Sequence, residues 1–335
     1  MSEKTYSGIL IYAQLTRDSN VLSVVSELAS ESQKLSQKLG NELVSAVVLT
    51  NDYNIDNIKS SLKNSGFDKV YILKNEIFKE YSTDIYSKVI IDLVKEVSPS
   101  IMLFGATTQG RDLAPVIASE LNTGLTADCT ALDINEKGKL AATRPTFGGN
   151  LMATILCKNY PQMATVRPKV LQVENIQGKD TEFFERYIEF NNLKSRTQII
   201  DFIKNIQNEN ITLNDSDIII AGGKGLKNEN GFKQLRELAN LLGGVVGATR
   251  GAVDIGIADS SMQIGQTGKT VCPKLYIAIG ISGAIQHQVG MCGSKKIIAI
   301  NSDEKAPIFD ISDIGIVGDL NEIIPELIKE LKSRG

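Results

Sequence analysis

Short apolar runs that alternate with amphipathic stretches constrain the fold of this 335-residue chain most strongly. In the first half, the apolar run Gly8–Ala13 precedes the amphipathic stretch Val21–Leu39, which Gly40 ends, and the apolar run Leu43–Leu49 follows. Short apolar runs predict buried strands, whereas apolar residues at a spacing near 3.6 predict helices. Strands that alternate with helices form parallel sheets. The sequence therefore predicts an α/β fold with a doubly wound sheet.

The same alternation continues through the first half. Further helices are predicted at 55–64, at 83–97 and up to Leu121, and further strands at 70–73 and 101–104. From Thr126 to Val173 the sequence is rich in β-branched residues and is punctuated by Gly and Pro. We expect the sheet to end in antiparallel strands in that region.

A second β-α-β series follows a polar stretch. Asn175–Gln207 is charged and has little β-branched periodicity, which is typical of a connection between domains. The second series then has predicted strands at 218–223, 245–246, 275–279 and 297–300 and predicted helices at 232–242 and 322–332. We therefore predict two Rossmann-like domains, with an N-terminal α/β domain at 1–195, a linker at 196–209 and a C-terminal domain at 210–335.

Composition and charge exclude several classes of protein. The 36 Lys and Arg residues nearly balance the 39 Asp and Glu residues, and no basic stretch resembles a phosphate-binding surface, so nucleic acid is not an expected partner. The longest apolar runs are far shorter than the ~20 residues that cross a bilayer. Met1–Lys4 does not open a signal peptide. These features predict a cytoplasmic protein without membrane insertion.

The cysteine and histidine content argues against a metal site. Cys129, Cys157, Cys272 and Cys292 are far apart and form no C-x-x-C pair, which disfavours an iron–sulfur cluster or structural zinc. We expect these cysteines to be reduced and buried. The one histidine, His287, cannot form a polyhistidine site. Any chemistry is therefore expected to belong to a bound organic cofactor.

Two polar clusters are the candidate site. A predicted strand runs into Gly280–Gly283 and then into a helix with His287, so free N–H groups at the helix start could bind a pyrophosphate. The spacing is not G-x-G-x-x-G, and a plain structural turn with a core histidine is the alternative. In the second cluster, Thr249–Asp254 and Gln263–Lys269 combine an arginine with amide and hydroxyl donors that suit an electron-rich heterocycle. A solvated loop is the alternative there. Both clusters are expected at the carboxyl edge of one sheet, where ligands bind.

These clusters also carry a resemblance to a known family. Arg250, the 263–269 loop and the 280–287 turn are followed by Ile298–Asn301, Ala306–Phe309 and Ile314–Leu320, in the order found in alpha subunits of electron transfer flavoproteins. The chain resembles this family over essentially its whole length. The resemblance implies one noncovalent FAD in the C-terminal domain, a beta subunit packed on the N-terminal domain, and electron exchange with an acyl-CoA dehydrogenase.

The resemblance also implies roles for single residues. Arg250 and His287 are the implied catalytic residues, with Arg250 over the isoalloxazine and His287 near its O2. Gln266 and Thr267 resemble donors near N5 and O4, and Asn301 and Asp319 resemble residues at the adenosine end. The full set of predicted FAD-binding residues is Thr249, Arg250, Gln263, Gly265, Gln266, Thr267, Ser282, Gly283, Ala284, Gln286, His287, Asn301 and Asp319. Thr249 replaces a more usual serine, and Lys224 stands where arginine is common.

The first half resembles one branch of the family. Arg144-Pro145, Gly148-Gly149-Asn150 and Pro161–Pro168 are similar to electron-bifurcating members from anaerobes, in which the beta subunit holds a flavin that NADH reduces and ferredoxin is a second acceptor. That likeness places Arg144 near the beta flavin. The alternatives are that these segments are only hairpin turns and that the protein is a non-bifurcating single-electron carrier to a quinone-linked acceptor. A pyridine-nucleotide dehydrogenase is disfavoured, because no G-x-G-x-x-G follows a strand, and a nucleotide-sensing module is weaker still.

Overall fold

The structure is a computed structural model in which two compact units are described. The described residues are 6–52, 55–63, 65–146, 151–174, 180–189, 195–197, 199–200, 213, 216–291 and 293–334. The first unit reaches residue 200 and the second begins at residue 213. Most of the predicted linker at 196–209 lies outside the described residues, so its bounds stay a prediction.

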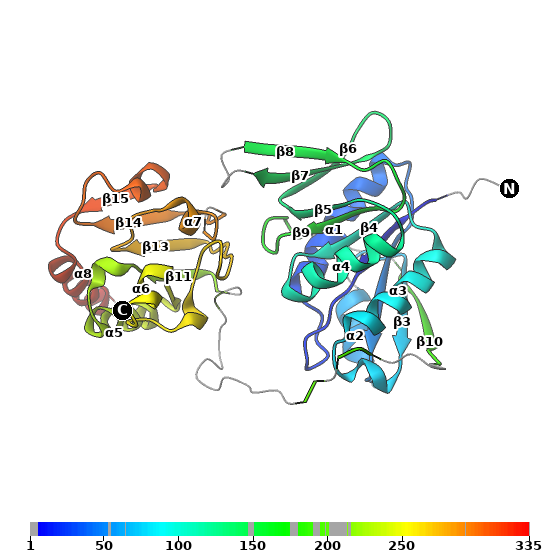
Figure 1. Cartoon of the computed structure of the whole chain (residues 1–335), viewed down its shortest axis with the longest axis horizontal. Helices are drawn as coiled ribbons and strands as arrows, with labels where there is room; N and C mark the ends of the chain where they lie inside the picture. Colours follow the sequence, from blue (N-terminus) through cyan, green and yellow to red (C-terminus); the bar gives the residue numbers. More distant parts are fainter. Residues whose placement is uncertain are drawn as a thin grey trace. The chain divides into compact units, whose positions relative to one another are not determined.

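The first unit contains a seven-stranded sheet in the order β10-β3-β2-β1-β4-β9-β5 (Figure 1), and every strand pair in it is parallel. Its strands are β1 (Ile9–Tyr12), β2 (Val44–Thr50), β3 (Lys69–Lys74), β4 (Ile101–Gly105), β5 (Leu125–Cys129), β9 (Gln162–Val166) and β10 (Glu182–Tyr187). Its helices are α1 (Ser23–Lys38), α2 (Asp56–Lys63), α3 (Thr83–Val97) and α4 (Thr108–Glu120), with a short 3₁₀ helix at Glu76–Lys79.

Alternation along the strands produces the two cores of this sheet. Ile9 and Ile11 of β1 pack in one core with residues of α1 and α2. Leu10 and Tyr12 pack in the other core with residues of α3 and α4. Because successive side chains of a strand point to opposite faces, a wholly apolar strand is buried on both. The sheet is therefore doubly wound, as the alternation predicts.

The expected antiparallel end of this sheet is wrong. Antiparallel strands do form, but β6 (Ala131–Ile134), β7 (Leu140–Thr146) and β8 (Leu151–Leu156) pair only with one another among the described strands, in a separate three-stranded sheet. The edge of the main sheet is instead β5, which runs parallel to β9. Apolar alternation identifies a strand, but it does not specify the strand beside which it lies.

The predicted connection Asn175–Gln207 also contains a strand. β10 pairs in parallel with β3 and forms the other edge of the main sheet. Its exposed side chains are held by ion pairs, because Lys59 and Lys74 bind Glu185 and Arg186 binds Glu96. Charges on an edge strand oppose pairing with a further strand. The same charges interrupt the apolar alternation, so the sequence pattern did not indicate this strand.

The second unit is a five-stranded parallel sheet in the order β12-β11-β13-β14-β15. Its strands are β11 (Ile218–Gly222), β12 (Val245–Ala248), β13 (Leu275–Ile279), β14 (Ile297–Asn301) and β15 (Ile314–Val317). Its helices are α5 (Glu229–Leu242), α6 (Arg250–Asp254), α7 (Ile285–Gln288) and α8 (Leu320–Arg334), with short 3₁₀ helices at Lys224–Leu226, Ser260–Met262 and Pro307–Ile311.

The two faces of the second sheet are covered differently. Residues of α5 and α8 pack on the face that carries Ile277 and Ile279. The other face, which carries Tyr276, is packed mainly by residues of loops and of the 3₁₀ helix Pro307–Ile311, such as Ile264 and Ile308. From β11 the chain passes through α5 to β12 on one side and later returns to β13 on the other side. The topological switch point therefore lies between β11 and β13.

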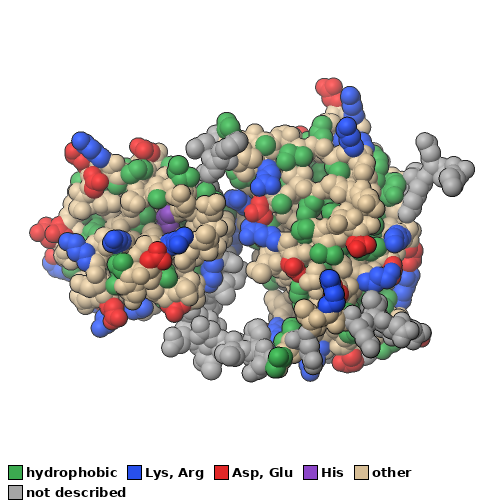
Figure 2. All heavy atoms as spheres, viewed as in Figure 1, with side chains coloured by type: hydrophobic (Ala, Val, Ile, Leu, Met, Phe, Trp, Pro, Cys, Tyr) green, Lys and Arg blue, Asp and Glu red, His purple; other side chains and the backbone are tan. Residues whose placement is uncertain are grey.

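Two further features concern location and surface. In the part of the chain that the structure describes, no helix is long and apolar enough to span a bilayer. On the face of the molecule in Figure 2, basic and acidic side chains are interspersed. The cytoplasmic location and the absence of a nucleic-acid partner stay predictions from the sequence.

Candidate functional site

A cavity of about 830 Å³ lies at the carboxyl ends of four strands of the second unit. The segment Gly223–Gly225 follows β11, Thr249 and Arg250 follow β12, Gly280–Ser282 follow β13, and Asn301 ends β14. The loops of neighbouring strands part at a switch point, and ligands of doubly wound sheets bind in the crevice that this leaves. The cavity therefore stands where the topology alone places a ligand.

Glycines bring the loops of this cavity close together. A Cβ on Gly223 would lie 2.0 Å from the carbonyl oxygen of Gly280, and a Cβ on Gly225 would lie 2.9 Å from the same oxygen. Gly283 has a φ of +84°, and a Cβ there would lie 2.3 Å from the amide nitrogen of Ile308. Side chains at these positions would force the loops apart. The glycines therefore allow the close approach of the loops that form the cavity wall.

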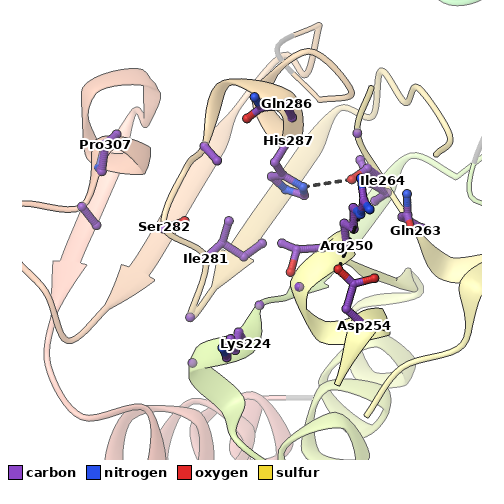
Figure 3. A pocket seen from close by; sticks show the side chains of 18 of the residues that line it. Lys224, Arg250, Asp254, Gln263, Ile264, Ile281, Ser282, Gln286, His287 and Pro307 are labelled. Carbon is purple, nitrogen blue, oxygen red and sulfur yellow. Dashed lines mark hydrogen bonds and ion pairs between the residues drawn. The ribbon is translucent and has the colours of Figure 1, made fainter. Parts of the chain in front are cut away.

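Helix α6 presents a cation to the cavity. The Thr249 hydroxyl caps this helix by accepting a hydrogen bond from the Ala252 amide at 3.3 Å, so the threonine performs the capping role that a serine would. Arg250 follows the cap, and its side chain is 69% exposed. Its Nε lies 3.5 Å from Oδ2 of Asp254 (Figure 3), so a carboxylate partly offsets the charge that Arg250 brings to the cavity.

The two polar clusters predicted from the sequence meet in this cavity. Within the 263–269 loop, Nε2 of Gln263 donates to the Thr267 hydroxyl at 2.9 Å. The backbone N–H of Gln266 donates to the carbonyl oxygen of Gln286 at 2.7 Å, which joins this loop to the turn after β13. A side-by-side arrangement of the two clusters was expected, and the structure has it.

His287 forms part of the cavity wall but is only 6% exposed. Its Nδ1 lies 3.0 Å from the carbonyl oxygen of Ile264 (Figure 3), and its Nε2 lies 3.0 Å from the hydroxyl of Tyr276. Burial lowers the pKa of this imidazole to about 4. The ring is therefore neutral at pH 7. The implied contact with a flavin O2 would need one of the two hydrogen bonds to open, and it stays a prediction.

The low pKa of His287 predicts acid sensitivity of the second unit. An unfolded chain binds the proton near pH ~6.5, whereas the folded chain binds it near pH 4, so unfolding takes up a proton between these values. The free energy of unfolding should then fall by about 2 kcal/mol between pH 7.5 and pH 5. Urea titrations of the wild type and of His287→Gln at both pH values measure this. Equal pH slopes in the two proteins would contradict the buried neutral imidazole.

All predicted site residues except Gly283 and Asp319 line the cavity. Gly283 is not a lining residue, but its backbone packs closely against Ile308. Asp319 lies at the start of α8, where its Oδ1 accepts a hydrogen bond from the Asn321 amide at 2.8 Å, so its implied role at the adenosine end stays a prediction. The amide of Asn301 is already engaged, because it donates to the Ile281 carbonyl at 2.8 Å and accepts from the Asp303 amide at 3.0 Å.

Several cavity residues were not in the predicted set. The segment Gly223-Lys224-Gly225, Asp254 and Asp303 all line the cavity. The glycine-rich turn after β11 could have been found with the rule applied to the turn after β13. Asp254 could have been found as the i+4 partner of Arg250 on a helix. Asp303 has no comparable signal, because its position depends on the fold of the loop after β14.

None of the three described cysteines lines this cavity. Cys129 is buried, and burial raises the pKa of its thiol to about 12. The expectation of burial is wrong for Cys157 and Cys272, which are partly exposed, and Cys292 lies outside the described residues. Within the described ranges, no three His, Cys, Asp or Glu side chains gather as a metal site would require.

The residues of the cavity fit the FAD that the resemblance implies. Its volume is within the ~300–1,000 Å³ of ligand pockets. Glycine backbones at two loops leave room for a pyrophosphate, and Lys224 and Arg250 bring positive charge to the cavity. Gln263, Gln266 and Thr267 bring amide and hydroxyl groups that can bind the polar edge of a planar ring.

Comparisons with known proteins agree with this fit. Residues 9–186 match the family model described as "Electron transfer flavoprotein domain", and residues 212–292 match "Electron transfer flavoprotein FAD-binding domain". The second match covers most segments that line the cavity.

Whole-length relatives point the same way. The chain is 48% identical to an electron transfer flavoprotein subunit alpha of Thermoanaerobacterium thermosaccharolyticum, covering 98% of each chain. It is 45% identical to the subunit of the same name from Clostridium acetobutylicum, covering 99% of each. It is 39% identical to the acryloyl-CoA reductase electron transfer subunit beta of Anaerotignum propionicum, covering 94% of this chain and 93% of that one.

Proposed function

The chain belongs to the family of electron transfer flavoprotein alpha subunits, and on that premise we propose that it works by flavin-based electron bifurcation. It binds FAD and transfers electrons as the partner of a beta subunit. In the proposal, NADH supplies electrons to a flavin in the beta subunit, an acyl-CoA dehydrogenase exchanges electrons with the FAD of this chain, and ferredoxin is the second acceptor. The non-bifurcating single-electron carrier is the alternative.

The cavity at the switch point is the observation that carries the electron-transfer part of this proposal. FAD held by the residues of this cavity would supply one-electron transfer chemistry. A reduced flavin carries negative charge, and the guanidinium of Arg250 on the cavity wall favours that charge. The neutral imidazole of His287 adds no such charge at pH 7. Arg250 is therefore the proposed tuning residue among those described.

One strand of the antiparallel sheet supports contact with a beta subunit. Strand β8 carries exposed apolar side chains, among them Leu151, Met152 and Leu156. Arg144 of β7 pairs across the ladder with Ala153 of the same strand β8. A contiguous apolar strand on a protein surface is typical of an interface. We assign this sheet to the contact with the beta subunit.

Arg144 supports the bifurcating form of the proposal. Its Nε is buried and has no hydrogen-bond partner within the described residues. A buried donor without a partner among the described residues is costly, and in the proposal a group of the beta subunit completes it on assembly. The likeness to bifurcating members supports the proposal that the flavin of the beta subunit lies near Arg144. The Anaerotignum propionicum relative, which its name assigns to a reductase of an enoyl-CoA, supports a dehydrogenase of acyl-CoA as the partner class.

An assay of coupling tests this function. The purified alpha–beta complex receives NADH, ferredoxin and an acyl-CoA dehydrogenase, with or without its enoyl-CoA. We expect ferredoxin reduction only when the enoyl-CoA is present, and we expect Arg144→Gln to lower the coupled rate at least 10-fold. Arg186→Gln, which changes an exposed arginine of β10, is the matched control and should keep the rate.

The same assay identifies the alternative. A complex with one flavin per heterodimer, or one with two flavins that never reduces ferredoxin, belongs to the non-bifurcating carriers. In that case Arg144→Gln would weaken assembly with the beta subunit and leave electron transfer to the dehydrogenase intact.

A further inference from the structure

A second cavity, here called the first-unit cavity, lies at the carboxyl ends of strands in the first unit and has a volume of about 260 Å³. Tyr12 ends β1, Thr50 ends β2 and Gln109 follows β4, and all three line it. From β1 the chain passes through α1 to β2 on one side and later returns to β4 on the other side. The switch point of this sheet therefore lies between β1 and β4, so the cavity stands where a doubly wound sheet binds ligands.

Aromatic side chains form much of the wall of the first-unit cavity. Tyr12, Phe78 and Tyr86 are buried, and Tyr81 is partly buried. The ring of Tyr86 meets the rings of Phe78 and Tyr81 edge to face, at centroid distances of 5.5 Å and 5.0 Å. Planar rings stack favourably on aromatic side chains, so this wall suits a flat ligand.

The tyrosine hydroxyls of this wall differ in where their protons go. Tyr86 donates to the carbonyl oxygen of Phe78 at 3.0 Å, and Tyr81 donates to a carboxylate oxygen of α4 at 2.6 Å. The Tyr12 oxygen instead accepts a hydrogen bond from Nε2 of Gln109 at 2.7 Å, and no described residue accepts the proton of Tyr12. Burial raises the pKa of Tyr12 well above its usual value, so the hydroxyl keeps that proton. A buried donor without an acceptor is costly, and a ligand acceptor in the cavity would remove this cost.

The buried lining residues carry no charge, and polar groups beside them can bind the edge of a ring. Asn51 and Gln109 bring side-chain amides, each of which can donate and accept. The edges of nucleobases carry the complementary acceptors and donors. The volume is slightly below the ~300 Å³ at the lower end of ligand pockets, so it suits a single small ring system and not a dinucleotide.

The charges beside this cavity do not favour a phosphate group. Its charged lining residues are Arg17, Lys79 and Glu80, and a guanidinium nitrogen of Arg17 lies 2.6 Å from a carboxylate oxygen of Glu80. The same three residues line a neighbouring hollow together with Asp18 and Asp52. The two cations are thus accompanied by three carboxylates, so the surroundings have no excess of positive charge that would attract an anion.

We propose that the first-unit cavity binds the uncharged base of a nucleoside, with the Tyr12 hydroxyl donating to a ring acceptor and the aromatic wall stacking on the ring. The proposal goes beyond the proposed function and does not depend on it, because this cavity shares no lining residue with the cavity assigned to FAD. It gives the switch point of the first sheet a ligand of its own.

Equilibrium dialysis of the purified alpha–beta complex with radiolabelled adenosine tests this site. We expect saturable binding to the wild type, and we expect Tyr12→Phe to raise the dissociation constant on the order of 10-fold or more, because the ring acceptor then lacks its donor. Tyr71→Phe, on β3 and outside the cavity lining, is the matched control and should bind adenosine like the wild type. Thermal unfolding of each complex confirms that the variants are folded.

Three results would overturn the proposal. One is that folded wild type shows no saturable binding of adenosine, uridine or adenine. Another is that adenosine binds equally well to the wild type and to Tyr12→Phe, which would place it elsewhere in the complex. The third is that indole, a flat ring without an acceptor nitrogen, binds as tightly as adenosine, since the cavity would then select only for apolar area. Flavin counting on the same samples tests the proposed function separately, because a complex without FAD would contradict that function and leave the adenosine result standing.

Discussion

Alanine at Gly283 is expected to remove the FAD of this chain and to destabilise the second unit by roughly 3 kcal/mol or more. The φ of this glycine is +84°, which costs an L-residue ~1 kcal/mol by itself. The added Cβ would also lie 2.3 Å from the backbone nitrogen of Ile308. Backbone cannot move aside like a side chain, so the turn after β13 and the loop after β14 must separate. Flavin content of the purified protein and its thermal unfolding measure both losses.

A second glycine separates the two causes. Gly243 ends α5 with a φ of +67°, and a Cβ there would meet nothing within 4 Å. Gly243→Ala should therefore cost only the conformational term of about 1 kcal/mol and should keep its FAD. Equal losses in the two variants would show that left-handed geometry, and not the contact with Ile308, explains the requirement for glycine.

Removal of the Arg250 charge is expected to lower the first midpoint potential of the bound FAD by roughly 50–100 mV. A unit charge a few ångströms from a ring is worth ~2–4 kcal/mol at an effective dielectric of ~20, and ~1.4 kcal/mol corresponds to ~59 mV for one electron. The exposure of Arg250 and its ion pair with Asp254 reduce that value. Redox titration of Arg250→Gln with FAD bound measures the shift.

Asp254 provides a test of opposite sign. Asp254→Asn removes the carboxylate that lies 3.5 Å from Arg250, so the potential should rise, and Arg250→Lys, which keeps a charge, should change it least. The sign pattern distinguishes a charge effect from general damage to the cavity, because damage would move all three variants in one direction. An unchanged potential in Arg250→Gln would assign the tuning to other groups.

The sequence predicted the strands that are buried on both faces and missed features that depend on pairing or charge. Helix α3 and strand β13 have the predicted bounds, because a wholly apolar run or a clear helical period leaves little choice. Strand β10 was assigned to the connection because the segment has little β-branched periodicity, and Glu182, Glu185 and Arg186 interrupt its apolar pattern. Its edge position makes those charges acceptable, and that position is a tertiary property.

At the site, too, features set by the local sequence were predicted and features set by the fold were missed. The loops around Arg250 and Ser282 were recognised because donors and glycines follow predicted strands, and the parallel sheet then brings them together. The neutral state of His287 could not be predicted, since it depends on burial and on Tyr276, eleven positions earlier in the sequence. The turn at Gly223 follows a predicted strand and could have been recognised, but only the fold shows that Gly223 packs against Gly280.

The count of FAD released by denaturation from three versions of the alpha–beta complex tests the central claim most directly. Ser282 is exposed and lines the cavity, so tryptophan there should fill the space of the cofactor without disturbing the core. Ile285 is exposed on the same turn and is not among the lining residues, so Ile285→Trp is the control. We predict that the wild type and Ile285→Trp release equal amounts of FAD, not FMN, and that Ser282→Trp releases one equivalent less per heterodimer. A folded Ser282→Trp complex with its full FAD content would contradict the placement of the cofactor in this cavity.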